Sequence, residues 1–358
     1  MTTPKLDKTD ATILQMLLKE SRTSFTAIAK ECGITVGAVR MRYKRLVREG
    51  IINGEVTLVN PHCLGYRHIV DLGIFCDSND EQEVAKYLEN KRVIGQVVPH
   101  LGKYNFYAKV ALSDLNKLSA IVEDLESNPK IKHVDTLIWA EAINCEFPTN
   151  LVIRPLPPSD TKLQRPPLTN IDQAPIELDE IDRKIAIIVS TKARTPFRHI
   201  AEEVGVSTKT VIQRYKKLRE KLLVRSTITI DMNKLGYKAL ADLLIKVTNR
   251  SKLTEIYSQL LQIPNVIVII RLLGDYDLYV AVALEDFSKM FDVSERISKI
   301  SGIEKPYFFL TPMVPSWPFN LFSSLLEADV MPKYYYSPDI SVPERLPSDH
   351  PANQNPDE

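Results

Sequence analysis

Residues 33–48 read GITVGAVRMRYKRLVR, and residues 205–220 read GVSTKTVIQRYKKLRE. Each stretch opens on a glycine that suits a tight turn and on a Thr or Ser that suits a helix cap. Apolar side chains then recur at the spacing of one buried helix face, and cationic side chains fill the remaining face. Because Arg and Lys neutralise phosphates, such a helix after a tight turn is typical of the groove-entering helix of a helix-turn-helix.

Two shorter helices are expected ahead of each third helix. Residues 7–19 and 182–189 repeat apolar side chains on one helix face. The next helix is expected to begin at a Ser24 or Thr195 cap and to end at Gly33 or Gly205. The side chains expected in the two cores are Ile13, Leu14, Leu17, Leu18, Val39, Tyr43 and Leu46, and then Ile185, Ile188, Val189, Val211, Tyr215 and Leu218.

The similarity between the two halves extends over most of the chain of 358 residues. Leu6–Tyr66 aligns with Leu178–Tyr237, and Gly102-Lys103-Tyr104-Asn105 falls on Gly274-Asp275-Tyr276-Asp277. Between the copies, residues 148–177 are rich in proline, which favours an extended linker. The sequence therefore predicts two copies of one unit.

After each third helix, short strands are expected at residues 51–59 and 223–230, which gives a winged helix-turn-helix. Both copies then follow the order strand, helix, strand, strand, helix, strand, which is that of the ferredoxin-like split βαβ fold. The strands are expected at residues 67–75, 93–99, 106–112 and 132–139, and then at 239–247, 266–273, 278–284 and 303–310. The predicted fold class is α+β, and one face of each sheet needs cover from a partner domain.

These patterns predict the domain boundaries. The winged helix-turn-helix domains are expected at residues 1–60 and 178–232, and the βαββαβ effector domains at 61–147 and 233–315. The C-terminal extension, residues 316–358, is expected to be largely disordered, with a short amphipathic helix at 319–326.

Composition limits the alternatives. The net charge is +1, so a nucleic-acid partner is indicated only by where the charges cluster. No apolar run is long enough for a membrane span, and a cytoplasmic protein is expected. Cys32, Cys63, Cys76 and Cys145 show neither metal-ligand nor disulfide spacing, and no catalytic arrangement appears. We therefore expect no metal, no cofactor and no enzymatic activity.

Together the motifs resemble those of the Lrp/AsnC (feast/famine) family of archaeal and bacterial transcriptional regulators. The matching residues are Leu-Asp-x-x-Asp at 6–10 and 178–182, Ser21-Arg22-Thr23 and Ala193-Arg194-Thr195, the Val-x-x-Arg of each third helix, the following Leu-Gly-Tyr, and the Gly-Asp-Tyr-Asp turn. The resemblance implies effector domains that pair through their sheets and that respond to amino acids or related metabolites near that turn. Most members have one unit per chain, so this chain resembles the tandem archaeal type.

Double-stranded DNA is the expected partner. Base edges are read from the N-terminal half of a recognition helix, and there the copies differ most, so we expect them to read unlike half-sites. The predicted DNA-binding residues are Thr35, Val36, Gly37, Ala38, Arg40, Met41, Arg42, Lys44 and Arg45, and then Ser207, Thr208, Lys209, Thr210, Gln213, Arg214, Lys216 and Lys217.

A small-molecule site is expected at the two turns. The predicted effector-binding residues are Gly102, Tyr104 and Asn105, and Gly274, Asp275, Tyr276 and Asp277. The first copy has Lys103 and Asn105 where the second has carboxylates, so a site that pairs with an α-ammonium group is expected in the second copy. We also expect self-association through the effector domains, by an intramolecular pseudo-dimer or a homo-oligomer.

Two other functions stay open. Siroheme decarboxylases resemble the same architecture and use His and Arg around a tetrapyrrole; His100 is a faint match, and it is expected to be a surface histidine at a strand end. The other alternative is a metabolite-sensing scaffold whose helix-turn-helix domains contact only proteins. The doubled cationic helix argues against that alternative.

Overall fold

The computed structural model describes residues 6–144, 175–318, 320–327 and 334–335. The first half contains α1 (Lys8–Lys19), α2 (Phe25–Cys32), α3 (Val36–Arg48), β1 (Ile52–Val59), β2 (His68–Cys76), α4 (Glu81–Asn90), β3 (Gln96–Pro99), β4 (Phe106–Leu112), α5 (Lys117–Glu126) and β5 (Ile131–Asn144). The second half contains α6 (Glu180–Thr191), α7 (Phe197–Val204), α8 (Thr208–Arg219), β6 (Leu223–Ile230), β7 (Ala239–Ile245), α9 (Leu253–Leu260), β8 (Val266–Leu273), β9 (Leu278–Leu284), α10 (Ser288–Ser298) and β10 (Tyr307–Pro312). A two-residue strand, β11 (Tyr334–Tyr335), follows.

The helix-turn-helix elements form where their local signals predict. Ser24, Thr35 and Ser207 each accept a backbone N–H at the start of a helix. Gly33 and Gly205 end α2 and α7 in the left-handed conformation, with φ of 65° and 73°. The side chains predicted for the two cores are buried, except that Ile188 is only partly buried.

The predicted Thr195 cap is wrong. Helix α7 begins after Pro196, and no side chain caps its first turn. The Thr195 hydroxyl instead donates to the carbonyl of Lys192 at 2.9 Å. Proline at the cap position leaves Thr195 one residue too early to reach the free N–H groups of the helix.

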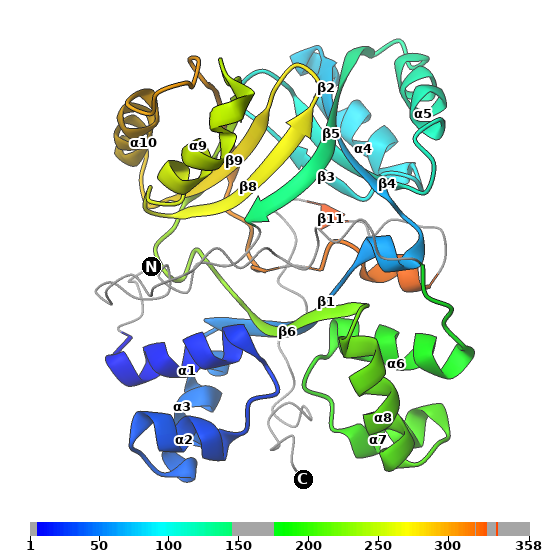
Figure 1. Cartoon of the computed structure of the whole chain (residues 1–358), viewed down its shortest axis with the longest axis vertical. Helices are drawn as coiled ribbons and strands as arrows, with labels where there is room; N and C mark the ends of the chain where they lie inside the picture. The colour runs from blue at the N-terminus through cyan, green and yellow to red at the C-terminus, as the bar shows by residue number, and fades with distance from the viewer. Residues whose placement is uncertain (1–5, 145–174, 319, 328–333, 336–358) are drawn as a thin grey trace.

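The strand after each third helix pairs with its counterpart from the other half. Strands β1 and β6 form a two-stranded antiparallel ribbon in which Glu55 lies opposite Ile228. The ribbon crosses the middle of the molecule, with the helices α1–α3 on one side below it and α6–α8 on the other (Figure 1). The two helix-turn-helix domains are therefore joined by main-chain hydrogen bonds.

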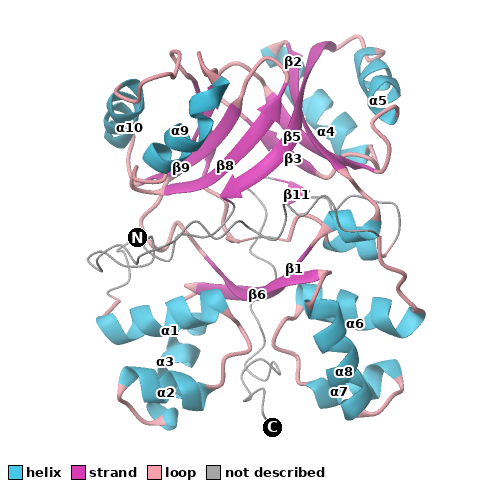
Figure 2. Cartoon of the chain, viewed as in Figure 1, coloured by secondary structure: helices cyan, strands magenta, loops and turns pink. Residues whose placement is uncertain are grey.

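The two effector sheets join edge to edge. Their order is β10-β7-β9-β8-β5-β2-β4-β3-β11, and the junction is the antiparallel pairing of β5 with β8. A bridge between Leu101 and Leu310 links the chain after β3 to β10. The two ends of the combined sheet are thus brought together, and the strands curve around a shared interior (Figure 2).

Each sheet is covered on its outer face by its own helices. Val84, Leu88 and Leu125 from α4 and α5 lie in one core, and α9 and α10 supply the equivalent core of the other sheet. The inner faces face each other across a third core. This arrangement supplies the cover that one-sided sheets require.

Three predicted strands have clearly different bounds, and for one of them, β5, the reason is a pairing with the other half. Strand β5 continues to Asn144, beyond the predicted Trp139, because residues 138–144 pair with β8. Strand β3 is limited to residues 96–99, and β10 begins only at Tyr307, where it pairs with Leu244 of β7.

The first part of the C-terminal extension lies between the ribbon and the effector sheets. Trp317 forms a backbone bridge with Ile230 of β6. The Asn320 amide donates to the carbonyl of Thr57 at 2.6 Å and to that of Ser190 at 3.2 Å. A short 3-10 helix, η6 (Ser323–Leu326), occupies part of the predicted amphipathic helix, and its Leu325 and Leu326 are buried.

Other predicted segments fall outside the described residues. These are the end of the first effector domain with Cys145 (residues 145–147), most of the linker (residues 148–174) and most of the extension (residues 319, 328–333 and 336–358). In the part of the chain that is described, no helix has the length and apolar character needed to cross a membrane.

Candidate nucleic-acid interface and effector domains

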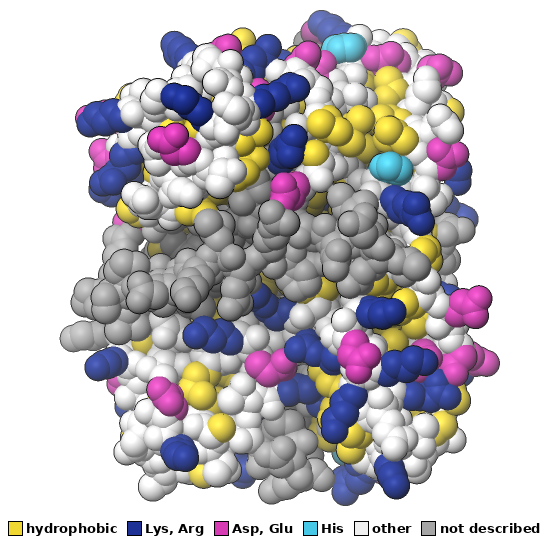
Figure 3. All heavy atoms as spheres, viewed as in Figure 1, with side chains coloured by type: hydrophobic (Ala, Val, Ile, Leu, Met, Phe, Trp, Pro, Cys, Tyr) yellow, Lys and Arg dark blue, Asp and Glu magenta, His cyan; other side chains and the backbone are white. Residues whose placement is uncertain are grey.

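Helix α3 presents a partly apolar surface where base edges would be read. Thr35, Gly37 and Met41 are exposed, and Met41 retains 72% of its accessible surface. Val36, Ala38 and Arg40 are partly exposed on the same helix. Lys44 and Arg48 are the exposed cations of this helix, and Figure 3 shows Lys and Arg side chains over both helix-turn-helix halves.

Helix α8 presents a more polar surface at the equivalent positions. Lys209 and Gln213 take the places of Gly37 and Met41, and both are exposed. Ser207, Thr208, Lys216 and Lys217 are also exposed, and Thr210 is partly exposed. None of the three lysines has an ion-pair partner within the described residues, so their charge is free to act on a ligand.

Three predicted DNA-binding arginines are engaged within the protein. Arg42 forms ion pairs with Asp7 at 2.7 Å and Asp10 at 2.8 Å, and Arg45 also binds Asp10. Arg214 repeats the pattern, with Asp179 at 2.5 Å and Asp182 at 2.8 Å. These contacts fasten the third helix of each domain to the start of its first helix.

A reciprocal pair of arginines joins the two helix-turn-helix domains. Arg22 donates to the carbonyl of Thr195 at 2.7 Å, and its guanidinium carbon lies 4.2 Å from the ring centre of Phe197. Arg194, 1% exposed, donates to the carbonyl of Ser21, and its guanidinium carbon lies 5.1 Å from the ring centre of Phe25. Each arginine thus stacks on an aromatic ring of the opposite domain.

Sequence reasoning did not assign a role to these arginines. A signal was present, because Arg22 and Arg194 occupy the same position in the two copies. Their partners lie in the other domain, however, and an isolated unit would leave both side chains at its surface.

A buried carboxylate lies in the same junction. Glu55 of β1 is 3% exposed, and its oxygens have no side-chain hydrogen-bond partner among the described residues, although the backbone N–H of Arg194 lies close enough to lower the pKa of this carboxyl. Burial raises the pKa of Glu55 to about 7, against the opposing effect of Arg194 and Arg22. Near neutral pH this group therefore changes charge in the folded protein.

The shift makes stability depend on pH. The pKa of Glu55 is about 7 in the folded protein and 4.5 in the reference state, so the folded protein binds the proton more tightly. The contribution to stability is present below pH 4.5 and is lost as the pH rises to 7. Relative to Glu55→Gln, the wild-type protein is expected to lose about 3 kcal/mol of unfolding free energy across this window. Urea denaturation at pH 4.5 and pH 8 measures the difference.

An exposed residue provides the control for this experiment. Glu220, at the end of α8, is exposed, and Glu220→Gln is expected to leave the pH dependence of stability unchanged. A difference between wild type and Glu55→Gln that stays constant with pH would show that Glu55 keeps an ordinary pKa.

The two predicted effector turns lie where the effector domains meet. A Cβ at Gly102 would be 2.9 Å from Cβ of Phe309 in β10, and one at Gly274 would be 3.4 Å from the carbonyl oxygen of Thr136 in β5. Tyr104 and Tyr276 are buried, and the Lys103 ammonium lies 5.0 Å from the ring centre of Tyr276. Each turn thus touches the last strand of the other effector domain.

Asn105 and Asp277 have matching structural roles in these turns. Asn105 accepts the backbone N–H of Cys76 at 2.9 Å, and Asp277 accepts that of Val247 at 2.9 Å. Asp277 also accepts Arg250 Nε at 2.8 Å. Asp275 is the exposed carboxylate of the second turn.

His100 is not the surface residue that the sequence predicted. Its side chain is 4% exposed, and its ring centre lies 5.6 Å from that of Phe309 and 5.3 Å from that of Tyr107. His100 directly follows β3, and its ring packs against Phe309 of the other effector domain. The sequence pattern of one domain does not show that a second domain buries this residue.

Comparison with protein families identifies both helix-turn-helix regions. Residues 178–219 match the model of the AsnC-type helix-turn-helix domain, and residues 6–53 match that of a winged helix-turn-helix DNA-binding domain.

Two curated relatives are transcriptional regulators. HTH-type transcriptional regulator FL11 of Pyrococcus horikoshii is 33% identical over 130 residues, which is 36% of this chain and 85% of that protein. Regulatory protein AsnC of Haemophilus influenzae is 28% identical over 135 residues, 37% of this chain and 90% of its own. Each matches about one third of the chain.

A solved structure matches the chain over most of its length. The siroheme decarboxylase NirDL covers 89% of this chain and 96% of its own, with a TM-score of 0.62 and 16% sequence identity. At this identity the match shows a shared fold. The named regulators, in contrast, are related to this chain in sequence, and both helix-turn-helix regions match family models, in agreement with the prediction of a DNA-binding regulator. The chain therefore belongs to the Lrp/AsnC family of DNA-binding transcriptional regulators.

Proposed function

We propose that the chain is a tandem repeat that binds DNA as a single-chain pseudo-dimer with two unlike readers. Family members with one unit would need two chains to present two helix-turn-helix domains. Here the β1–β6 ribbon and the Arg22–Arg194 exchange hold two domains of one chain at the same end of the molecule (Figure 1). The single observation that carries the proposal is this direct connection between the two domains.

The two readers differ in chemistry. Gln213 is suited to hydrogen-bond an adenine edge, whereas the exposed thioether of Met41 in the other domain offers only apolar contact. On α8, Lys209, Lys216 and Lys217 contact DNA phosphates, and on α3 Lys44 contacts one. Arg42, Arg45 and Arg214 orient the third helices through their carboxylate partners.

The effector domains are proposed to respond to a small molecule. For an amino acid at the second turn, Asp275 is the available carboxylate, because Asp277 is already occupied by Val247 and Arg250. A cytoplasmic location is also part of the proposal, since DNA is the partner. We further propose self-association of chains through the effector domains, as a step separate from the occupation of one DNA site by one chain.

Mobility shift of genomic DNA fragments tests the proposal. The full chain is expected to retard a subset of fragments at low salt, with one chain on each bound site. Failure to shift any fragment at low salt would support the alternative of a scaffold that contacts only proteins.

A further inference from the structure

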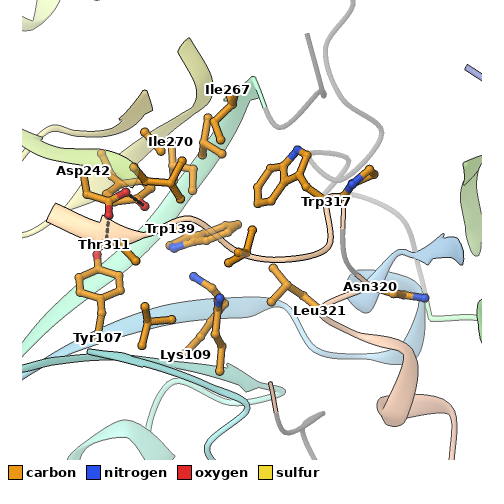
Figure 4. Close-up of a pocket in the computed structure, with 18 of the residues that line it drawn as sticks. Tyr107, Lys109, Trp139, Asp242, Ile267, Ile270, Thr311, Trp317, Asn320 and Leu321 are labelled. Carbon is orange, nitrogen blue, oxygen red and sulfur yellow. Dashed lines mark hydrogen bonds between the residues drawn. The ribbon is translucent and has the colours of Figure 1, made fainter. Parts of the chain in front are cut away.

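A cavity of about 140 Å³ lies inside the combined effector sheet. Strands β3, β4, β5, β7, β8, β9 and β10 contribute to its wall, and Trp317, Pro318, Asn320, Leu321 and Phe322 lie along one side. Trp139, Lys109, Trp317 and Leu321 are arranged around this space in Figure 4. An apolar cavity of about 150 Å³ admits benzene, so a space of this size can hold a small flat aromatic molecule.

The lining is mostly apolar and aromatic. Ile267, Val268, Ile270 and Leu240 supply aliphatic surface, and Trp139 supplies a ring. The ring centres of Tyr107 and Tyr279, which also line the cavity, lie 5.9 Å apart at an interplanar angle of 19°. Such surroundings favour a flat apolar body.

The charged side chains of the lining already have partners. Lys109 forms a buried ion pair with Asp71, which also accepts Trp139 Nε1 at 2.5 Å. Asp242 accepts the hydroxyls of Tyr279, at 2.6 Å, and Thr311. His100 Nε2 lies 3.6 Å from the same carboxylate.

Three polar atoms of the lining residues, His100 Nδ1, the Tyr107 hydroxyl and Asn320 Oδ1, have no hydrogen-bond partner among the described residues. All three atoms are buried. Burial raises the pKa of Tyr107 well above its usual value, so the phenol keeps its proton and remains a donor. A buried polar group without a partner costs free energy that a ligand would recover.

We propose that this cavity binds a small, flat, uncharged aromatic molecule that has a hydrogen-bonding edge, and that its binding changes the affinity for DNA. A free amino acid is excluded on physical grounds, because its ammonium and carboxylate groups would be buried next to charges that are already paired. A polycarboxylate tetrapyrrole is excluded by the size of the cavity and by the pairing of Lys109 with Asp71.

The position of the cavity provides the connection to DNA. Its wall includes Leu58 of the β1–β6 ribbon and Asn320. The Asn320 amide donates hydrogen bonds to the carbonyls of Thr57 and Ser190. A ligand that touches both Leu58 and Asn320 would favour one position of the ribbon and hence one placement of the two readers. This connection rests on the proposed function, whereas occupation of the cavity does not.

Calorimetry and DNA binding on the full chain test the two parts separately. Indole and 2-naphthol serve as uncharged probes, and tryptophan serves as the charged counterpart of indole. We expect one indole to bind per chain and tryptophan to bind at least tenfold more weakly. Ala281→Phe fills the cavity from β9 and is expected to abolish indole binding. Tyr107→Phe removes one hydroxyl and is expected to weaken binding roughly fivefold.

The outcomes are distinguishable. Three results would overturn the cavity assignment. They are the absence of binding heat with both indole and 2-naphthol, an affinity for tryptophan equal to that for indole, and an unchanged affinity for indole in a folded Ala281→Phe protein. If Ala281→Phe does not fold, Tyr107→Phe decides, and an unchanged affinity overturns the assignment. Indole binding without any change in DNA affinity overturns the connection to DNA, and absence of DNA binding by the wild-type chain without ligand is a failure of the proposed function alone.

Discussion

Replacement of Lys209, Lys216 and Lys217 by alanine is expected to lower the affinity for DNA on the order of a hundredfold at physiological salt. The three ammonium groups are exposed on α8 and have no ion-pair partner among the described residues. Each phosphate that a lysine neutralises also releases condensed counterions. The slope of log affinity against log salt should therefore become less negative by roughly 0.9 for each phosphate that the variant no longer neutralises. Fluorescence anisotropy over a salt series measures both quantities.

A matched triple variant controls for net charge. Lys252, Lys289 and Lys305 are exposed in the second effector domain, whose helices α9 and α10 lie at the end of the molecule away from the helix-turn-helix domains. Of these lysines, Lys289 pairs with Asp292 at 3.2 Å. Their replacement by alanine removes the same charge and is expected to leave the salt slope unchanged. Equal decreases of affinity in the two triple variants would show that α8 makes no phosphate contact and that only the overall field matters.

Replacement of Arg194 by methionine is expected to lower the free energy of unfolding by about 3–5 kcal/mol. Methionine keeps much of the apolar stem but cannot donate to the carbonyl of Ser21, and it leaves Glu55 with one fewer cation nearby. The rings of Phe25 and Tyr43 also lose their cation–π partner. Because Arg194 joins the two helix-turn-helix domains, DNA affinity should fall with stability even though Arg194 itself is buried.

Arg198→Met is the control for this change. Arg198 lies on α7 of the same domain with its side chain 64% exposed, and its replacement is expected to alter stability by no more than roughly 0.5 kcal/mol. Urea denaturation gives both values. A decrease of stability in Arg194→Met as small as that in Arg198→Met would contradict the structural role of the reciprocal arginines.

The helix-turn-helix domains could be predicted from sequence because their signals are local. The cap at Thr35, the left-handed Gly33 and the buried spacing of Val39, Tyr43 and Leu46 each depend on neighbours within a few residues. Such signals act through the geometry of one helix or one turn, and they predicted the helix ends except at Thr195, where Pro196 takes the cap position.

Contacts between the two halves could not be predicted in the same way. An alternating strand such as β1 shows which side chains are buried but not which strand lies beside it, so its pairing with β6 was missed. The same limit explains the buried His100, the extension of β5 along β8, and the cavity that His100 and Asp242 help to line. Each depends on a partner that is distant along the chain.

The central claim is tested most directly by selecting binding sites from random DNA. The number of chains per site is then measured on the selected sequence. The two readers of one chain predict a site with two dissimilar half-sites, spaced by about one helical turn and occupied by a single chain. Changing Gln213 should alter only the half-site contacted by α8. A perfect palindrome, or a site that needs two chains to present two equivalent α8 helices, would contradict an asymmetric single-chain pseudo-dimer.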